Sequence, residues 1–241
     1  MPGVPPLDPP ALPGPALLGQ NWRDTVFAHW PVPPERVAPL LPAHTRPDVL
    51  HGFTYVGLVA FRAPSTTALG IPVGGFDEVN VRLYSVDSHG RQGVVFLSMD
   101  ATAPHSVLAA RTLVGLPYLW SRIRLRGDDH THTGTVLRHP LRGGVRGRWR
   151  LTVGEPLADP SPLEHFVTAR WGLHTARAGR TWWIRVHHRP WPLYRVRSWT
   201  YQGNLLQAAG VHVDAPEPVS VLWSPGVDAH ATPSLATAPR T

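Results

Sequence analysis

The sequence contains no cysteine and no lysine. Without cysteine the chain has no disulfide framework, no thiolate nucleophile and no cysteine-based metal site. Without lysine it has no side-chain amine that could form a Schiff base with a carbonyl compound. A run of about eighteen apolar residues, the length of a membrane-spanning helix, is also missing. The N-terminal stretch MPGVPPLDPPALPGPALLG lacks the basic start of a signal peptide. We therefore expect a cytoplasmic protein that does not span a membrane.

The positive charge of the chain comes entirely from arginine, because all 23 basic residues are of this type against 16 acidic residues, a net charge of +7. Such a balance is typical of proteins that bind nucleic acid or an anionic surface. Apart from RIRLR (Arg122 to Arg126) and RGGVRGRWR (Arg142 to Arg150), however, the arginines are scattered. The absence of lysine indicates a compositional bias of the source genome, so we do not expect nucleic acid as a partner. Binding of nucleic acid or an anionic surface stays as the alternative.

The chain reads as one α+β domain built mainly from an antiparallel sheet. Its 241 residues, 42% of them hydrophobic, are enough for a substantial core. We expect a flexible proline-rich arm over 1–19, a single domain over 20–228 and a loose tail over 229–241. Helices are predicted at 33–42, 104–115, 161–171 and 203–210, the third with Ser161 and Glu164 as a capping box. The IPVGG stretch (71–75) reads as a turn, and DSHGRQG (87–93) as the turn of a hairpin.

The stretch FDEVNVRLY (76–84) alternates as a strand with two unlike faces. Val79, Val81 and Leu83 share one face, whereas Glu78, Asn80, Arg82 and Tyr84 share the other. Polar residues in such a stripe lie either on a solvated sheet face or along the wall of a pocket. If the valine face packs outward beneath helices, then Asn80 and Arg82 are candidate ligand-binding residues. The strand pattern alone leaves both alternatives open.

An arginine interrupts the apolar face of the helix predicted at 104–115. Arg111 shares that face with Val107, Leu108 and Val114. A buried arginine needs an anion, either a bound ligand or a carboxylate of the chain such as Glu78. The second alternative describes a ligand-free scaffold that holds a structural ion pair.

The segments FAHWPVPPERVAPLLP, FDEVNVRLY, GVVFLSMDA, AARTLVGLPY and SPGVD together resemble the YqjF-like family of uncharacterised bacterial proteins. The resemblance runs from about Asn21 to Asp228. That family is similar to acetoacetate decarboxylase, which implies a curled antiparallel sheet closed into a cone-like barrel around a pocket, with a few short helices packed on it.

The decarboxylase motif implies which residues would line that pocket. ARTLVGLPYL places Arg111, Gly115 and Pro117 on the arginine, glycine and proline of the motif. Tyr118 then occupies the place of the Schiff-base lysine, and Glu78 matches the pocket glutamate. Tyrosine cannot form an imine, although its phenol can hydrogen-bond or transfer a proton.

We therefore predict Glu78, Arg111 and Tyr118 as catalytic residues acting on a small organic acid, a keto acid or enolate-like anion. If the protein is an enzyme, it is a lyase or isomerase that uses acid–base chemistry and no lysine Schiff base. We predict no cofactor and no metal site, because His130 and His132 lack a distant third ligand. Association into a homo-oligomer stays open.

Overall fold

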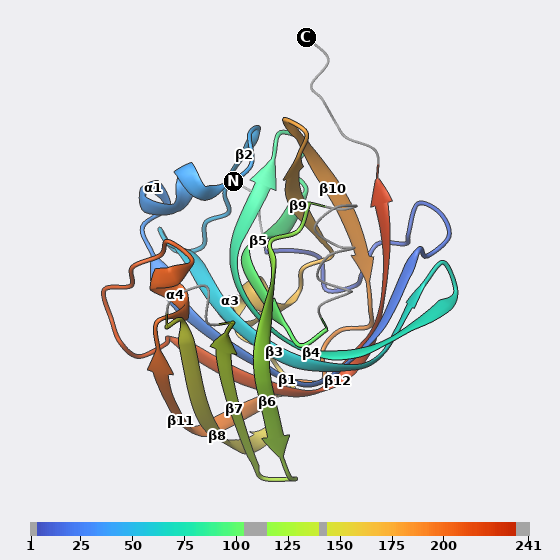
Figure 1. Ribbon diagram of the computed structural model, residues 1–241. Helices are drawn as coiled ribbons and strands as arrows, with labels where there is room; N and C mark the ends of the chain where they lie inside the picture. The colour runs from blue at the N-terminus through green and yellow to red at the C-terminus, as the bar shows by residue number, and fades with distance from the viewer. Residues whose placement is uncertain (1–3, 104–114, 140–143, 235–241) are drawn as a thin grey trace.

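The computed structural model describes residues 4–103, 115–139 and 144–234 (Figure 1). The strands of its first half are β1 (Leu18–Val32), β2 (Thr45–Pro47), β3 (Thr54–Ala68), β4 (Ile71–Asp87), β5 (Gln92–Ala101) and β6 (Tyr118–Gly127). Those of its second half are β7 (Thr131–Arg138), β8 (Arg146–Pro156), β9 (Gly172–Arg177), β10 (Arg180–His187), β11 (Tyr194–Gly203) and β12 (Ser220–Ser234). The helices are α1 (Pro34–Val37), the 3₁₀ turn η1 (Ala38–Leu40), α3 (Pro162–Thr168) and α4 (Leu205–Ala208).

Nine of the described strands close into a barrel. The hydrogen-bonded order runs β5–β6–β7–β8–β11–β12–β1–β3–β4, and β4 pairs again with β5. Strand β2 extends this sheet at β4, whereas β9 pairs with β5 and β10 pairs with β12. Among the described strands β5 pairs in parallel with β6 and with β9, and the other pairings are antiparallel. The predicted curled and closed sheet is therefore confirmed, with mixed rather than purely antiparallel pairing.

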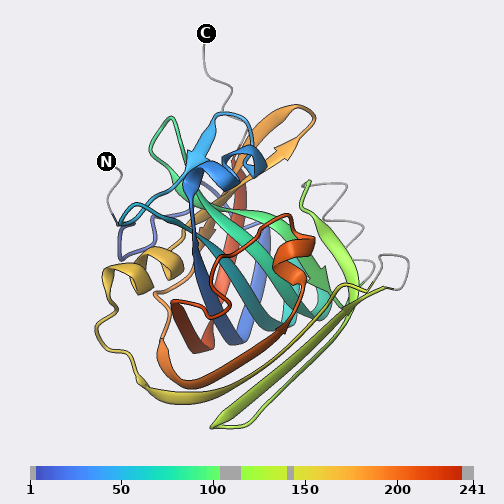
Figure 2. The same cartoon turned by 90° about the vertical axis from the view of Figure 1, so that its left-hand side faces the viewer.

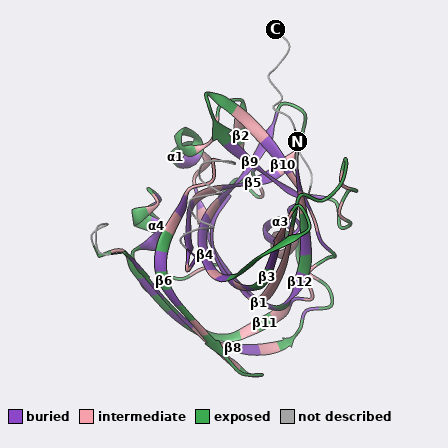
Figure 3. Cartoon of the chain, turned by 45° about the vertical axis from the view of Figure 1, so that its right-hand side comes forward, coloured by how far each residue is buried: buried purple, intermediate pink, exposed green. Residues whose placement is uncertain are grey.

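The central strands β1, β3 and β4 are covered on both faces. One face packs on the layer made by β6, β7 and β8 and on α4, in a core that includes Val79, Val81, Leu83, Trp149 and Leu205. The other face packs on β9, β10 and α3, where the core residues are Tyr84, Phe166, Leu173, Ile184 and Val186. Figure 3 shows α3 within the ring that β4, β3, β1 and β12 form on this second side. A strand buried on both faces must place its polar residues in the interior.

Local sequence signals account for most of these elements. The capping box is present at α3, since the Ser161 side chain accepts a hydrogen bond from the Glu164 backbone and the Glu164 carboxylate accepts one from the Ser161 backbone. The hairpin turn between β4 and β5 is also confirmed. The expected turn at IPVGG is wrong, because Ile71 begins β4 and pairs with Ala68 of β3. The helix predicted at 104–115 falls outside the described residues except for Gly115.

Residues 4–17 and 229–234 contact the folded body. In the first segment, where we expect a flexible arm, the backbone carbonyls of Pro5, Pro6 and Ala11 accept hydrogen bonds from His165, Trp171 and Arg185. Strand β12 continues past Asp228, where we expected a loose tail to begin. Its last residues pair with β1 and with β10, so the segment 229–234 closes the sheet instead of leaving it.

Candidate functional site

The polar face of β4 is buried on the side of the molecule that contains α3. Glu78 is 1% exposed and Asn80 is 2% exposed. The alternative of a solvated sheet face is therefore wrong. The pocket alternative required the valine face of the same strand to lie outward beneath helices. This condition is not met, because that face packs on β6–β8 and on α4 in the barrel core.

Three of the predicted site residues are joined by hydrogen bonds. The Tyr118 hydroxyl donates to Glu78 Oε2 at 2.8 Å, and Asn80 Nδ2 donates to Glu78 Oε1 at 2.9 Å. Sheet register brings them together, because Asn80 pairs with Met99 across β4 and β5, and Met99 pairs with Tyr118 across β5 and β6. Residues that pair across neighbouring strands point to the same side of the sheet. A buried carboxyl group, an amide and a phenol thus converge from separate parts of the sequence.

The surroundings of Glu78 favour its neutral form. Burial raises the pKa of Glu78 to about 7, and the nearby Asp100 carboxylate acts in the same direction. The hydrogen bonds from Asn80 and Tyr118 and the charge of Arg82 oppose this shift in part. Burial, together with the Glu78 carboxylate, also raises the pKa of the Tyr118 phenol well above its ordinary value. Near neutral pH, Glu78 can therefore either release or accept a proton, whereas Tyr118 stays protonated.

Aromatic and aliphatic side chains surround this group. Those that pack on the same side of the sheet as Tyr118 include Phe27, Val59, Phe61, Met99 and Leu222. Trp22 and Trp191 stack against each other at 5.8 Å between ring centroids and pack on this cluster. Since the cluster excludes water, electrostatic interactions within it are stronger than they would be at the surface.

Arg82 lies further along the same face of β4, where it meets the end of α3. Its Nη2 donates to the carbonyl oxygen of Val167 at 3.0 Å, and the Tyr84 hydroxyl donates to the same oxygen at 3.0 Å. His29 Nε2 hydrogen-bonds to the Tyr84 hydroxyl at 2.6 Å. Burial, and then the positive charge of Arg82, lowers the pKa of His29 well below its ordinary value, so the ring is neutral. Gly57 makes room for this ring, because a Cβ there would lie 2.9 Å from His29 Nε2.

The fifth predicted site residue, Arg111, lies outside the described residues. The sequence patterns did not reveal a second buried cation, Arg170, which follows α3. Its Nη1 forms an ion pair with Asp48 Oδ2 at 2.5 Å, and its guanidinium lies over the Phe166 and Tyr84 rings. No sequence periodicity identifies this pair, because Asp48 belongs to a loop that is remote in the chain.

Comparison with known proteins places the chain in a family. The family model described as an uncharacterized conserved protein, DUF2071, matches residues 19–228. The chain belongs to the DUF2071 family. It is 26% identical over 208 residues to the uncharacterized protein YqjF of Bacillus subtilis, a match that covers 84% of this chain and 86% of that protein. The predicted YqjF-like resemblance is therefore confirmed.

Solved structures with a similar fold are acetoacetate decarboxylase-like. Acetoacetate decarboxylase from Legionella pneumophila superposes with a TM-score of 0.67 at 13% identity, covering 95% of this chain and 93% of that chain. An acetoacetate decarboxylase-like enzyme from Sphingomonas wittichii gives 0.63 at 16% identity, with 94% of each chain covered. The enduracididine biosynthesis enzyme MppR, complexed with pyruvate, gives 0.61 at 14% identity, with 94% and 91% covered. At these identities the likeness concerns the fold.

A buried ion pair lies on the reverse face of the sheet from Glu78 in this DUF2071 protein. Arg138 of β7 donates through Nε to Asp100 Oδ1 at 2.8 Å and through Nη2 to Asp100 Oδ2 at 3.0 Å. The Ser121 hydroxyl also donates to Asp100 Oδ1, at 2.6 Å. This carboxylate is fully paired, yet it lies close enough to raise the pKa of Glu78.

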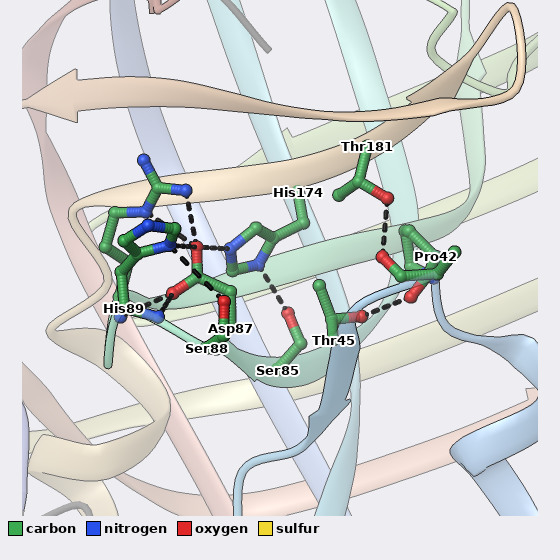
Figure 4. A network of polar contacts seen from close by, with 10 residues as sticks. Pro42, Thr45, Ser85, Asp87, Ser88, His89, His174 and Thr181 are labelled. Carbon is green, nitrogen blue, oxygen red and sulfur yellow. Dashed lines mark hydrogen bonds and ion pairs between the residues drawn. The ribbon is translucent and has the colours of Figure 1, made fainter. Parts of the chain in front are cut away.

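A second polar network, between β4 and β9, contains a serine, a histidine and an aspartate (Figure 4). Ser85 Oγ lies 2.8 Å from His174 Nδ1, and His174 Nε2 lies 3.4 Å from Asp87 Oδ2. Ser85 is 0% exposed, and Asp87 also accepts hydrogen bonds from the backbone of His89 and Arg91 in the hairpin turn. Asp87 also forms an ion pair with Arg91 at 2.6 Å, so this network ties the hairpin turn between β4 and β5 to β9.

Within the ranges 4–103, 115–139 and 144–234, no cluster of three or more metal-ligating side chains is present. None of the helices described there is both long and apolar enough to cross a membrane.

Proposed function

We propose that this DUF2071 protein binds a small organic acid, such as a keto acid, on the Glu78 side of the barrel and exchanges a proton with it. The proposal depends on one observation: a nearly fully buried carboxyl group is hydrogen-bonded to a phenol, and its pKa is about 7. General acid–base catalysts work best when their pKa lies near the working pH. Perturbed, buried titratable groups concentrate at functional sites, which supports a chemical role for Glu78.

In the proposed reaction, the Glu78 carboxylate removes a proton from the carbon atom next to a ketone. Negative charge then develops on the ketone oxygen, where a hydrogen bond from the protonated Tyr118 phenol would stabilise it. Arg82, whose positive charge acts on Glu78, would attract the carboxylate of the substrate, and the family resemblance adds Arg111. The carbon of the enolate then takes a proton back from the Glu78 carboxylic acid, which regenerates the ketone. The enolisation is therefore reversible, and its net result is exchange of the proton next to the ketone with solvent.

The absence of lysine directs the proposal away from decarboxylation through an imine. The reactions that remain candidates are enolisation, hydration and dehydration, which isomerases and lyases catalyse. The structural neighbour MppR is described in complex with pyruvate, and this supports a keto acid as the first ligand to test.

The test uses pyruvate, 2-oxobutanoate and acetoacetate in deuterated buffer, with NMR to follow loss of the protons next to the ketone. We expect Glu78→Gln and Tyr118→Phe each to slow this exchange by roughly 100-fold or more. Glu217→Gln, which changes an exposed carboxylate, is the matched control and should leave the exchange rate unchanged.

The same samples separate the competing functions. Saturable binding of a keto acid by ligand-observed NMR, with no proton exchange, would identify a binding protein and not an enzyme. A ligand-free scaffold is favoured by the fact that both Glu78 oxygens already have partners within the chain. A ligand-free scaffold would show neither keto-acid binding nor proton exchange, and this result would overturn the proposal. Exchange rates that are unchanged in both Glu78→Gln and Tyr118→Phe would also overturn it.

A further inference from the structure

The outer side of the β6–β7–β8–β11 layer is an arginine-rich sheet face, here called the arginine face. Strands β6 and β8 carry six exposed arginines: Arg122, Arg124 and Arg126 on β6 and Arg146, Arg148 and Arg150 on β8. None of the six forms an ion pair with a carboxylate of the described residues, and the residues of β7 that pair with them are uncharged. Strand β11 adds Arg195 and Arg197, which pair with Glu164 and Glu155. Figures 1 and 2 show this layer at the margin of the molecule, with no described element on its outer side.

Strand register arranges these arginines as a grid. Across β7, Arg124 and Arg148 both pair with Thr135, and Arg126 and Arg150 both pair with Thr133. Neighbours along one strand are therefore about 6.7 Å apart, and the two columns about 9.6 Å apart. The two arginine-rich segments, separate in the sequence, thus form one continuous positive surface. Six guanidinium groups so close together repel one another unless anions lie among them.

An aromatic pair and a hollow adjoin the grid. Trp120, two residues before Arg122 on β6, is 48% exposed and stacks on His139 with ring centroids 4.5 Å apart. At the other edge, β8 and β11 enclose a hollow of about 580 Å³ lined by Arg146, Gly147, Arg148, Gln202, Gly203 and Asn204. In this hollow Gln202 Oε1 accepts from Arg148 Nε at 3.0 Å, and Asn204 Oδ1 accepts from the Arg146 backbone at 2.9 Å. The Gln202 amide nitrogen can donate to a base edge.

We infer that the arginine face binds single-stranded nucleic acid. Guanidinium groups recognise phosphates through several hydrogen bonds, and bases stack on exposed aromatic rings beside a positively charged groove. Four-stranded sheets with exposed aromatics bind single-stranded RNA in this way. A second copy of the chain is a poor occupant, because a symmetric contact would place arginines against arginines. An anionic membrane would engage apolar side chains as well, but Trp120 and Leu137 are the only large apolar residues exposed among the described residues of this face.

The test is fluorescence anisotropy with labelled 20-nucleotide poly(dT) and poly(U) over a range of salt concentrations. Each phosphate contact contributes about 0.7 to the slope of log affinity against log salt for a single strand. We expect the triple variant Arg124→Gln, Arg148→Gln, Arg150→Gln to bind at least about tenfold more weakly near 0.1 M salt and to lower the slope by roughly two. Trp120→Leu should weaken binding about tenfold and leave the slope unchanged, because it removes stacking and no charge.

The control is the double variant Arg46→Gln, Arg180→Gln, which removes exposed arginines of β2 and β10, away from this layer. It should bind like the unmodified chain. The inference is overturned if poly(dT) and poly(U) do not bind at low salt, or if the control weakens binding as much as the triple variant. Preference for duplex DNA, or for phosphatidylserine vesicles with no affinity for single strands, would also overturn it. None of these binding measurements depends on Glu78, so their outcome is independent of the test for keto-acid proton exchange.

Discussion

Glu78 illustrates how a single residue can be stabilised by specific contacts and still destabilise the fold. Its carboxyl group accepts two hydrogen bonds, from Asn80 and Tyr118, but the cost of burial exceeds their contribution and raises its pKa to about 7. An unfolded chain would ionise the same group at an ordinary pKa near 4.5. Because the folded state holds its proton more tightly, the contribution of Glu78 to folding stability falls as pH rises from about 4.5 through 7.

The Glu78→Gln variant should therefore show a distinct pH profile. Glutamine keeps an acceptor for Tyr118 and cannot ionise, so the variant should match the unmodified chain near pH 4.5 and exceed its stability above pH 7. The expected gain is roughly 3 kcal/mol, from a pKa difference of about two units or more. Urea unfolding at several pH values between 4.5 and 8.5 measures it. A stability difference that does not vary with pH would show that Glu78 ionises normally.

At the scale of the element, β5 carries two chemically distinct environments on its two faces. Met99 points toward Tyr118 and the Glu78 group, whereas Asp100 points to the other face, toward Ser121 and Arg138. The Asp100–Arg138 pair joins β5 to β7 across β6 and thus holds in place the parallel pairing on which the position of Tyr118 depends. A buried ion pair contributes little net stability, but removal of one partner is costly because the other charge stays unpaired.

We therefore expect Asp100→Asn to destabilise the protein by about 3–5 kcal/mol, through the unpaired Arg138. Ser121→Ala removes one hydrogen bond from the same carboxylate and should cost only about 1 kcal/mol. The double variant Asp100→Leu, Arg138→Met should recover most of the stability lost in Asp100→Asn. Guanidinium unfolding of the three proteins tests this order, and equal losses in Asp100→Asn and Ser121→Ala would refute it.

At the scale of the whole molecule, closure depends on strand β12. It pairs with β1, β10 and β11, so one strand connects the nine-stranded barrel of the described chain to the β9–β10 hairpin. The pairing with β10 uses residues His230 to Ser234. Without the β12–β10 pairing, the β9–β10 hairpin would be joined to the sheet mainly through β5.

A chain that ends at Asp228 should accordingly melt roughly 10 °C or more below a chain that ends at Ser234, since several ladder hydrogen bonds and their packing are lost together. Hydrogen exchange should be faster at the backbone amides of Trp183 to His187 in the shorter chain. Differential scanning calorimetry of the two truncations measures the shift. Equal melting temperatures would mean that the contacts of β12 with β10 contribute nothing to closure.

The sequence by itself determined the local elements and the chemical identity of the groups. The alternation of FDEVNVRLY, the capping box at Ser161 and the hairpin turn after Asp87 each depend on contacts within a few residues, so the printed order of residues is sufficient to predict them. The absence of lysine is equally a property of composition. The family resemblance suggested Glu78 and Tyr118 together, although 40 residues separate them.

Only the tertiary structure decided which faces are buried and which distant residues meet. Period-2 alternation identifies two faces of a strand, but it does not tell whether both are covered, as they are for β4. The pairs Asp48–Arg170 and Asp100–Arg138, and the union of two arginine segments on one face, arise from sheet closure and register. These depend on pairing between strands far apart in the chain, and no local pattern of residues encodes them.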